Sequence, residues 1–64
     1  MRLKQIRKQK KVSLKMLEEI SGVSNGYISE LENGIKKNPT YETLKKLSKA
    51  LEVKVEDLIS NDPR

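Results

Sequence analysis

The sequence predicts an all-α fold, a compact domain of five helices, and three observations support this class. Apolar residues recur at intervals of three and four, the spacing that places them on one side of a helix. Ser13, Ser24 and Thr40 each precede such a segment, and a hydroxyl oxygen can accept hydrogen bonds from the unpaired N–H groups of a first helical turn. Neither Asn-Gly pair is flanked by the apolar/polar alternation of strands, so we do not expect a β-hairpin.

The first helix is expected over residues 2–10, where Leu3 and Ile6 stand three positions apart. The second helix follows Ser13 and ends at a tight turn at Gly22-Val23. Its inner face consists of Leu14, Leu17 and Ser21, with Ile20 at the edge of that face.

The third helix begins after Ser24, and its residues divide into an apolar face and a polar face. At about 100° per residue, Ile28 and Leu31 fall on the apolar side and Glu32 falls at its edge. The opposite side is small and polar, without a long Lys or Arg, so it can enter the major groove of DNA closely. That polar side consists of Asn25, Gly26, Ser29, Glu30 and Asn33.

Gly34 is expected to end the third helix, because glycine adopts a positive φ without steric hindrance. A basic loop over residues 35–39 then leads to a fourth helix, whose apolar residues are Leu44, Leu47, Ala50 and Leu51. A short fifth helix carries Val53, Val55, Leu58 and Ile59, for which closure of the core is favoured over a dimer interface. We expect one domain at residues 1–60, with residues 61–64 as a flexible tail or the start of a linker.

The composition excludes several classes of protein. The chain has no Cys and no His, which removes disulfides, the usual zinc ligand sets and the common nucleophiles and bases. We therefore expect no metal, no cofactor and no enzymatic activity. No apolar run approaches the ~20 residues of a membrane-spanning helix, and no signal peptide is recognisable, so we expect a cytoplasmic protein.

The charge of the chain is unevenly distributed, although its net value is only +5. Residues 1–15 carry seven basic side chains and no acidic one, whereas residues 16–34 carry four acidic side chains and no basic one. Residues 35–50 add five Lys against a single Glu. Basic segments on both sides of a neutral-to-acidic helix are typical of a surface that meets a polyanion at its edges, and equally of a solvated Lys-rich face.

The polar side of the third helix carries groups that suit base edges in the major groove. Asn25 can bond N6 and N7 of adenine, Glu30 can accept from N4 of cytosine, and Ser29 is permissive. Gly26 would let the backbone approach DNA, but a glycine in a first helical turn also has little effect on a fold. On the residues alone, ordinary solvated side chains remain an alternative.

Residues 2–59 resemble the Cro/C1-type (XRE-like) helix-turn-helix domains of phage and bacterial repressors. The resemblance lies in GVS at the turn, YISELENG through the third helix, NPT before the fourth, and the V-x-x-E-D-L-I ending. It implies a lambda-repressor-like fold, in which the second and third helices form the helix-turn-helix and the third docks in the major groove of double-stranded DNA.

The resemblance also implies roles for particular residues. The residues expected to read bases are Asn25, Gly26, Ser29 and Glu30. The residues expected to contact phosphates are Ser13, Ser24, Tyr27, Lys36, Lys37, Asn38 and Thr40. Members of the family commonly pair an Arg of the first helix with a Glu at the end of the third, which implies an ion pair between Arg7 and Glu32.

Three residues depart from the pattern of the family. Glu18 stands where Ala is usual, so we expect its carboxylate to turn to solvent and the second and third helices to approach less closely. Leu14 stands where many members have a Gln that touches a phosphate. Lys54 replaces the usual Ser or Thr cap of the last helix, which leaves the start of that helix undefined.

The expected function is sequence-specific binding of double-stranded DNA by a transcriptional regulator, with repression as the expected effect. A single small module makes few contacts, so we expect a homodimer on an inverted repeat, with half-sites about one helical turn apart. An additional effector or partner protein is compatible with this reading. The alternative is a helical protein-interaction module that does not bind DNA, because the reading side has no basic residue.

Overall fold

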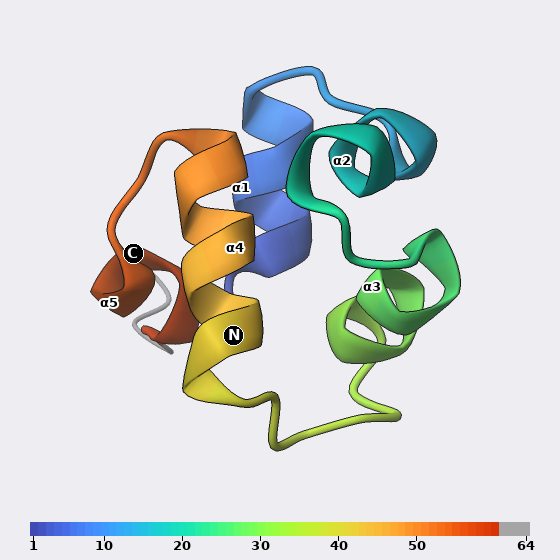
Figure 1. Ribbon diagram of the computed structural model, residues 1–64. Helices are drawn as coiled ribbons and strands as arrows, with labels where there is room; N and C mark the ends of the chain where they lie inside the picture. Colours follow the sequence, from blue (N-terminus) through green and yellow to red (C-terminus); the bar gives the residue numbers. More distant parts are fainter. Residues whose placement is uncertain (61–64) are drawn as a thin grey trace.

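The computed structural model describes residues 1–60, and these residues form five α-helices and no strand (Figure 1). The all-α class predicted from the sequence is therefore confirmed. The proposed tail or linker at residues 61–64 lies outside the described residues. The helices are α1 (Leu3–Gln9), α2 (Leu14–Ser21), α3 (Asn25–Glu32), α4 (Tyr41–Leu51) and α5 (Val55–Ile59).

Side-chain caps define the first turns of the three longest helices. The backbone N–H of Met16 donates to Ser13 Oγ at 3.0 Å, and that of Tyr27 donates to Ser24 Oγ at 3.2 Å. At the start of α4, the backbone N–H of the third helical residue donates to Thr40 Oγ1 at 3.2 Å. Each hydroxyl thus satisfies a donor that has no partner within its helix, as predicted.

Residues with a left-handed φ follow four of the helices, and only two of these residues are glycines. Gly22 ends α2 with φ 80°, and Gly34 has φ 76° one residue beyond the C-cap of α3. Lys11 and Glu52 adopt φ 57° and 58° after α1 and α4, although neither is glycine. A residue with a Cβ in this conformation raises the free energy of the fold by roughly 1–2 kcal/mol.

The start of α5 is defined by a residue inside the helix. The Asp57 carboxylate accepts from the backbone N–H of Lys54 at 3.1 Å, so the N-cap is held although Lys54 itself supplies no oxygen. The N-terminal end of the chain is joined to this helix, because the backbone N–H of Arg2 donates to the Leu58 carbonyl at 2.7 Å. Helix α5 therefore closes the domain against the beginning of α1.

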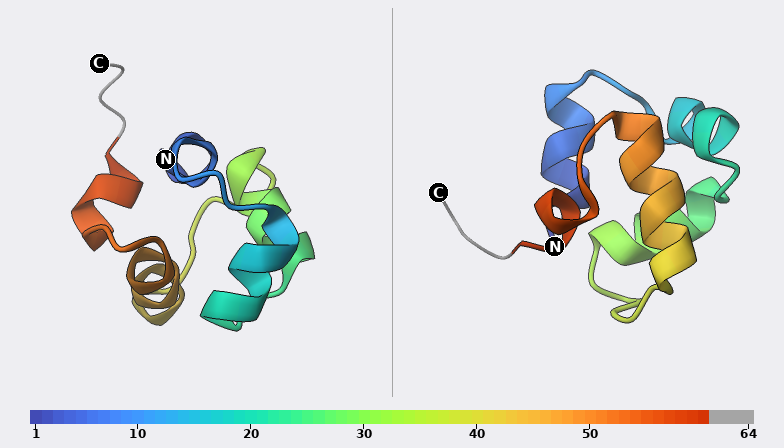
Figure 2. Two further views of the ribbon diagram at one scale, coloured as in Figure 1. Left: turned by 90° about the horizontal axis from the view of Figure 1, so that it is seen from above. Right: turned by 60° about the vertical axis from the view of Figure 1, so that its left-hand side comes forward.

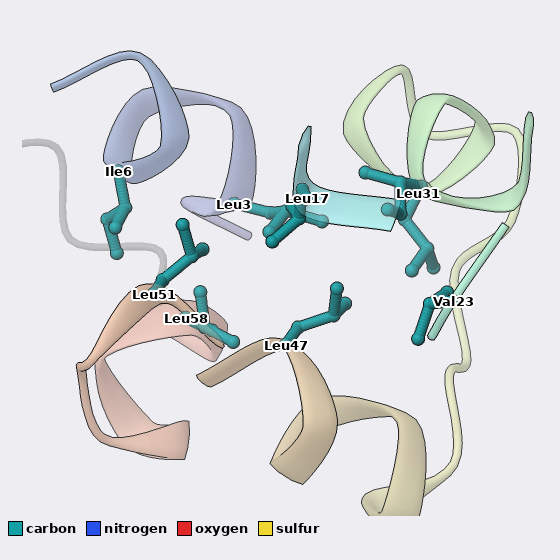
Figure 3. Close-up of a cluster of buried hydrophobic side chains, with 9 residues drawn as sticks. Leu3, Ile6, Leu17, Val23, Leu31, Leu47, Leu51 and Leu58 are labelled. Carbon is teal, nitrogen blue, oxygen red and sulfur yellow. The ribbon is translucent and has the colours of Figure 1, made fainter. Parts of the chain in front are cut away.

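The core lies where the five helices meet (Figure 3). Helix α2 packs on α3 and α4, α1 packs on α3 and α5, and α4 packs on α5 (Figures 1 and 2). Every helix contributes at least one buried side chain, and the turn before α3 adds one more. The cluster consists of Leu3, Ile6, Leu17, Val23, Ile28, Leu31, Leu47, Leu51 and Leu58.

Two of the apolar residues that the sequence placed on the inner faces of helices are exposed to solvent. Ile20, at the edge of the inner face of α2, is 58% exposed, because α3 and α4 already cover the side of α2 that holds Leu17. In α5, Leu58 is fully buried while Ile59 is 49% exposed. Closure of the core by this helix, which the sequence favoured, is therefore carried out by Leu58. Within residues 1–60, none of the helices is sufficiently long and apolar to cross a membrane.

Candidate nucleic-acid interface

The turn between α2 and α3 is held by one serine and one buried valine. Ser21 Oγ donates to the Leu17 carbonyl at 2.6 Å and accepts from the backbone N–H of Val23 at 3.1 Å. Val23 is buried in the core, so the chain leaves α2 and enters α3 in a single arrangement. Together with the left-handed Gly22, these contacts form a compact helix-turn-helix.

The inner face of α3 attaches the helix to the rest of the domain. Ile28 and Leu31 are buried, and Tyr27 is partly buried against the same core. This agrees with the apolar face predicted for these residues. Because one side of α3 is used for packing, its other side remains available at the surface.

An ion pair joins the end of α3 to α1. Arg7 Nε lies 2.6 Å from Glu32 Oε2, and Arg7 Nη2 donates to Glu32 Oε1 at 3.2 Å, a two-bond arrangement. A third guanidinium hydrogen bond reaches the Val12 carbonyl at 2.8 Å. The side chains are only 10% and 3% exposed, so the pair is part of the interior of the domain.

The outward side of α3 is polar and has little bulk. Asn25 and Gly26 are exposed, whereas Ser29 and Glu30 are partly buried. Within residues 1–60, the Glu30 carboxylate has no hydrogen-bond or ion-pair partner. It is therefore free to accept a hydrogen bond from a ligand.

Asn33 joins this side of α3 through contacts that the sequence did not predict. Its Nδ2 donates to the Ser29 carbonyl at 2.9 Å and to Ser29 Oγ at 3.2 Å. The two side chains thus form a unit, in which Ser29 lies about one helical turn and Asn33 about two turns beyond Asn25. The spacing of four residues is the only sequence signal that could have indicated this contact.

The fold does not require glycine at position 26. Gly26 has no positive φ, and a Cβ built there would meet no atom within 4 Å. By contrast, Gly22 and Gly34 both need the left-handed conformation. The absence of a side chain at Gly26 therefore has no role in the packing of the free domain.

Glu18 forms a hydrogen bond with α3 that the sequence did not predict. Its Oε1 accepts from Asn25 Nδ2 at 2.7 Å, so the carboxylate joins α2 to the first residue of α3. The carboxylate lies at the surface, where the sequence placed it, and its bond to Asn25 was not predicted. The amide of Asn25 is close enough to form this bond because the short turn brings the end of α2 beside the start of α3.

The loop between α3 and α4 carries cations beside the outward side of α3. Lys36, Lys37 and Asn38 are exposed. The backbone N–H groups of Ile35 and Lys36 both donate to the Glu30 carbonyl, at 2.9 and 3.1 Å, so the start of the loop is anchored to α3. The segment that joins α1 to α2, also basic, lies at the other end of the molecule (Figures 1 and 2).

The serine and threonine caps differ in what remains available to a phosphate. Ser13 and Ser24 each accept one backbone hydrogen bond, and their side chains lie at exposed positions. Thr40 accepts from the backbone of Thr43 and also donates its hydroxyl to Thr43 Oγ1 at 3.0 Å. A phosphate contact through the Thr40 hydroxyl requires this second bond to break, whereas Ser13 and Ser24 need no such change.

Comparisons with known proteins agree with this geometry. Residues 3–58 match the helix-turn-helix family. The chain is 41% identical over 59 residues to the HTH-type transcriptional regulator SinR of Bacillus licheniformis, covering 92% of this chain and 53% of that protein. It is 39% identical over 57 residues to the HTH-type transcriptional repressor RghR of Bacillus subtilis strain 168, covering 89% and 42%.

A solved structure, the N-terminal DNA binding domain of SinR from Bacillus subtilis, has a TM-score of 0.89 and 38% sequence identity. The alignment covers 98% of this chain and 91% of that one. The chain spans about half the length of the SinR regulators that it matches. The family consists of regulator domains and is not a class of enzymes. This chain belongs to the XRE-type helix-turn-helix family and has the fold of a DNA-binding domain.

Proposed function

We propose that this domain binds double-stranded DNA sequence-specifically as the reading part of a transcriptional regulator. The observation that carries the proposal is the outward side of α3, which is small, polar and unpacked while the inner side is buried. An α-helix fits the major groove, and the edges of the bases are distinguished there by hydrogen bonds. The bases are read by Asn25, Gly26, Ser29 and Glu30, and Asn33 holds Ser29 in place.

The phosphate contacts come from the ends of the helices and from the basic loop. Ser13 and Ser24 lie at the N-termini of α2 and α3, where unpaired N–H groups and the helix dipole favour an anion. The remaining contacts come from Tyr27, Lys36, Lys37, Asn38 and Thr40. Neutralising about 4–6 phosphates gives a plot of log affinity against log salt with a slope of roughly −4 to −5.

The domain acts as a homodimer on an inverted repeat, with half-sites about one helical turn apart. One small module makes few contacts with DNA. A dimer makes twice as many, which raises the affinity and requires two half-sites at a defined spacing. The apolar side chain of Ile59 on α5 is 49% exposed and is available for self-association. The effect on transcription is repression, the effect that the name of RghR gives for that relative. The domain acts in the cytoplasm.

Selection of bound sequences from a random pool of DNA duplexes tests these points together. We expect enrichment of one sequence with two-fold symmetry, bound with the salt dependence given above. Enrichment of a half-site alone would contradict the dimer but not the reading of DNA. No enrichment, or an affinity that is indifferent to salt, would contradict DNA binding and favour a protein-interaction module.

A further inference from the structure

Glu18 and Asn25 link the two helices of the helix-turn-helix at the edge of the reading surface. Glu18 Oε1 accepts from Asn25 Nδ2 at 2.7 Å. Asn25 is the first residue of α3 and is exposed, while Glu18 belongs to α2 and is partly buried. Hydrogen bonds to an ionised acceptor are roughly twice as strong as those between neutral groups. The bond lies at the surface in contact with solvent, so it biases rather than fixes the orientation of the Asn25 side chain before any DNA arrives.

The chemistry of the bond determines which end of the amide faces Glu18. An ionised carboxylate accepts hydrogen bonds and has none to donate, so only the NH₂ end of Asn25 can face it. Within residues 1–60, Asn25 Oδ1 has no hydrogen-bond partner. In the absence of Glu18, an exposed amide could present either end to a ligand. With Glu18, the oxygen and one of the two N–H donors of the amide remain unpaired, and the oxygen is held away from Glu18.

An acceptor at this position distinguishes between bases. In the major groove, adenine and cytosine present an amino group, N6 or N4, whereas guanine presents O6 and N7 and thymine presents O4, all acceptors. We propose that Glu18 is a positioning residue that sets the base preference of Asn25, by holding its amide with the oxygen available to an amino group. The proposal rests on the proposed DNA binding, and it assigns part of the sequence preference to a residue outside α3.

The test compares base preferences of the parent chain with those of Glu18→Ala at one base pair. The parent chain first selects a duplex from a random pool. The base pair to be tested is the position of that duplex at which Asn25→Ala loses the base preference. We expect the parent to favour adenine or cytosine over guanine or thymine by about 5- to 150-fold, the range for a good contact with a base edge. In Glu18→Ala, this ratio should approach one, while preferences at the other base pairs remain.

Two further variants separate the hydrogen bond from charge. Glu19→Ala removes the same charge from an exposed position of the same helix, and it should leave the ratio unchanged. Glu18→Gln keeps a hydrogen-bonding group of the same shape, but its amide can donate as well as accept and so can face either end of Asn25, and the ratio should fall. A ratio retained in full in Glu18→Gln would overturn the requirement for a partner that only accepts. So would loss of the ratio in Glu19→Ala, because it would show a general effect of charge.

The outcomes also separate positioning from a purely structural role. If Glu18 acts through Asn25, then Glu18→Ala has no further effect on base preference in the Asn25→Ala background. If Glu18→Ala weakens binding to all duplexes to a similar extent, whatever the base at each position, the packing of α2 on α3 has changed. That result would overturn the proposal. An unchanged ratio in Glu18→Ala would overturn it as well, with DNA binding itself intact. A parent chain that selects no sequence would overturn both proposals.

The contact can also be measured in the free chain. The side-chain amide protons of Asn25 should shift in the NMR spectrum of Glu18→Ala, and they should not shift in Glu19→Ala. This readout does not involve DNA, so it reports the bond even when the binding experiment fails. Amide signals that are the same in the parent and in Glu18→Ala would overturn the proposal.

Discussion

At the scale of single residues, Arg7 makes three side-chain hydrogen bonds that join α1 to the following turn and to α3. Its guanidinium donates to two oxygens of Glu32 and to the carbonyl of Val12, and the charged groups are almost fully excluded from water. Removing one partner of such a pair leaves a buried charge without compensation. The pair therefore holds α1, the following turn and the end of α3 in one arrangement.

We expect Arg7→Ala to lower the free energy of unfolding by about 3–5 kcal/mol, because Glu32 stays buried without a partner. Urea denaturation of the two proteins measures the change. Lys8→Ala, an exposed neighbour on the same helix, serves as the control and should have a small effect. A melting temperature equal to that of the parent would show that the buried pair does not support the fold.

Substitution of Gly26 is expected to change stability and DNA affinity in opposite directions. A Cβ at this position meets no other atom, so Gly26→Ala should raise the free energy of unfolding by up to about 1 kcal/mol, through helix propensity. The affinity for DNA should fall, because the added methyl group keeps the backbone away from the groove. Denaturation and DNA titration of the same variant measure both effects. If affinity is unchanged, Gly26 has no reading role.

At the scale of the elements, the helix ends show where the chain is under strain. Helices α2 and α3 are followed by glycines that take the left-handed conformation freely, at Gly22 and Gly34. Helix α4 ends instead at Glu52, with φ 58°. Its negative charge also lies near the negative end of the helix dipole, which is unfavourable. This end of α4 is therefore a site where the domain can be stabilised.

Glu52→Gly should raise the free energy of unfolding by about 1 kcal/mol, because glycine removes the steric hindrance of a positive φ and the substitution removes the charge. The gain is reduced by the greater freedom of glycine in the unfolded chain. The midpoint of urea denaturation gives the result, with DNA affinity as a check that α3 is undisturbed. For comparison, Glu56→Gly replaces a glutamate in the first turn of α5 and should destabilise. A lower midpoint for Glu52→Gly would contradict the assignment of strain.

At the scale of the whole molecule, the charge and the reading surface occupy different places. The outward side of α3 has no basic residue, while cations lie in the loop after α3 and in the segment before α2. Attraction to phosphates and discrimination among bases are consequently assigned to separate segments. Such a division means that each can be altered without the other.

Lys37→Ala should weaken binding to every duplex to a similar extent and reduce the magnitude of the salt slope by about 1. Glu30→Ala should instead relax the choice at particular base pairs by ~1–3 kcal/mol, with little change in the salt slope. Titrations of a selected and a random duplex over a range of salt concentrations measure both quantities. Equal losses on the two duplexes from Glu30→Ala would show that Glu30 does not read bases.

Much of the fold followed from short-range patterns in the sequence. The caps at Ser13, Ser24 and Thr40 were predicted because the donor that each satisfies lies three residues away. The end of α4 was harder to recognise, because Glu52 adopts a conformation that the sequence marks with no glycine. The start of α5 was left undefined because its support comes from Asp57, within the helix.

Some features of the candidate site also follow from short-range patterns in the sequence, and others depend on tertiary packing. The separation of α3 into a buried and an outward side was predictable, because 100° per residue follows from helix geometry alone. The exposure of Ile20 was not, since it depends on which side of α2 the neighbouring helices cover. The roles of the individual side chains at DNA remain predictions.

The sequence by itself determined the five helices, the side-chain caps of α2, α3 and α4, and the polar side of α3, because these depend on contacts within a few residues. Only the tertiary structure decided that the Glu18 carboxylate meets the Asn25 amide across the turn. That outcome depends on how closely α2 packs on α3, and on which amide end a carboxylate can bond. Neither condition can be read from the spacing of seven residues between them.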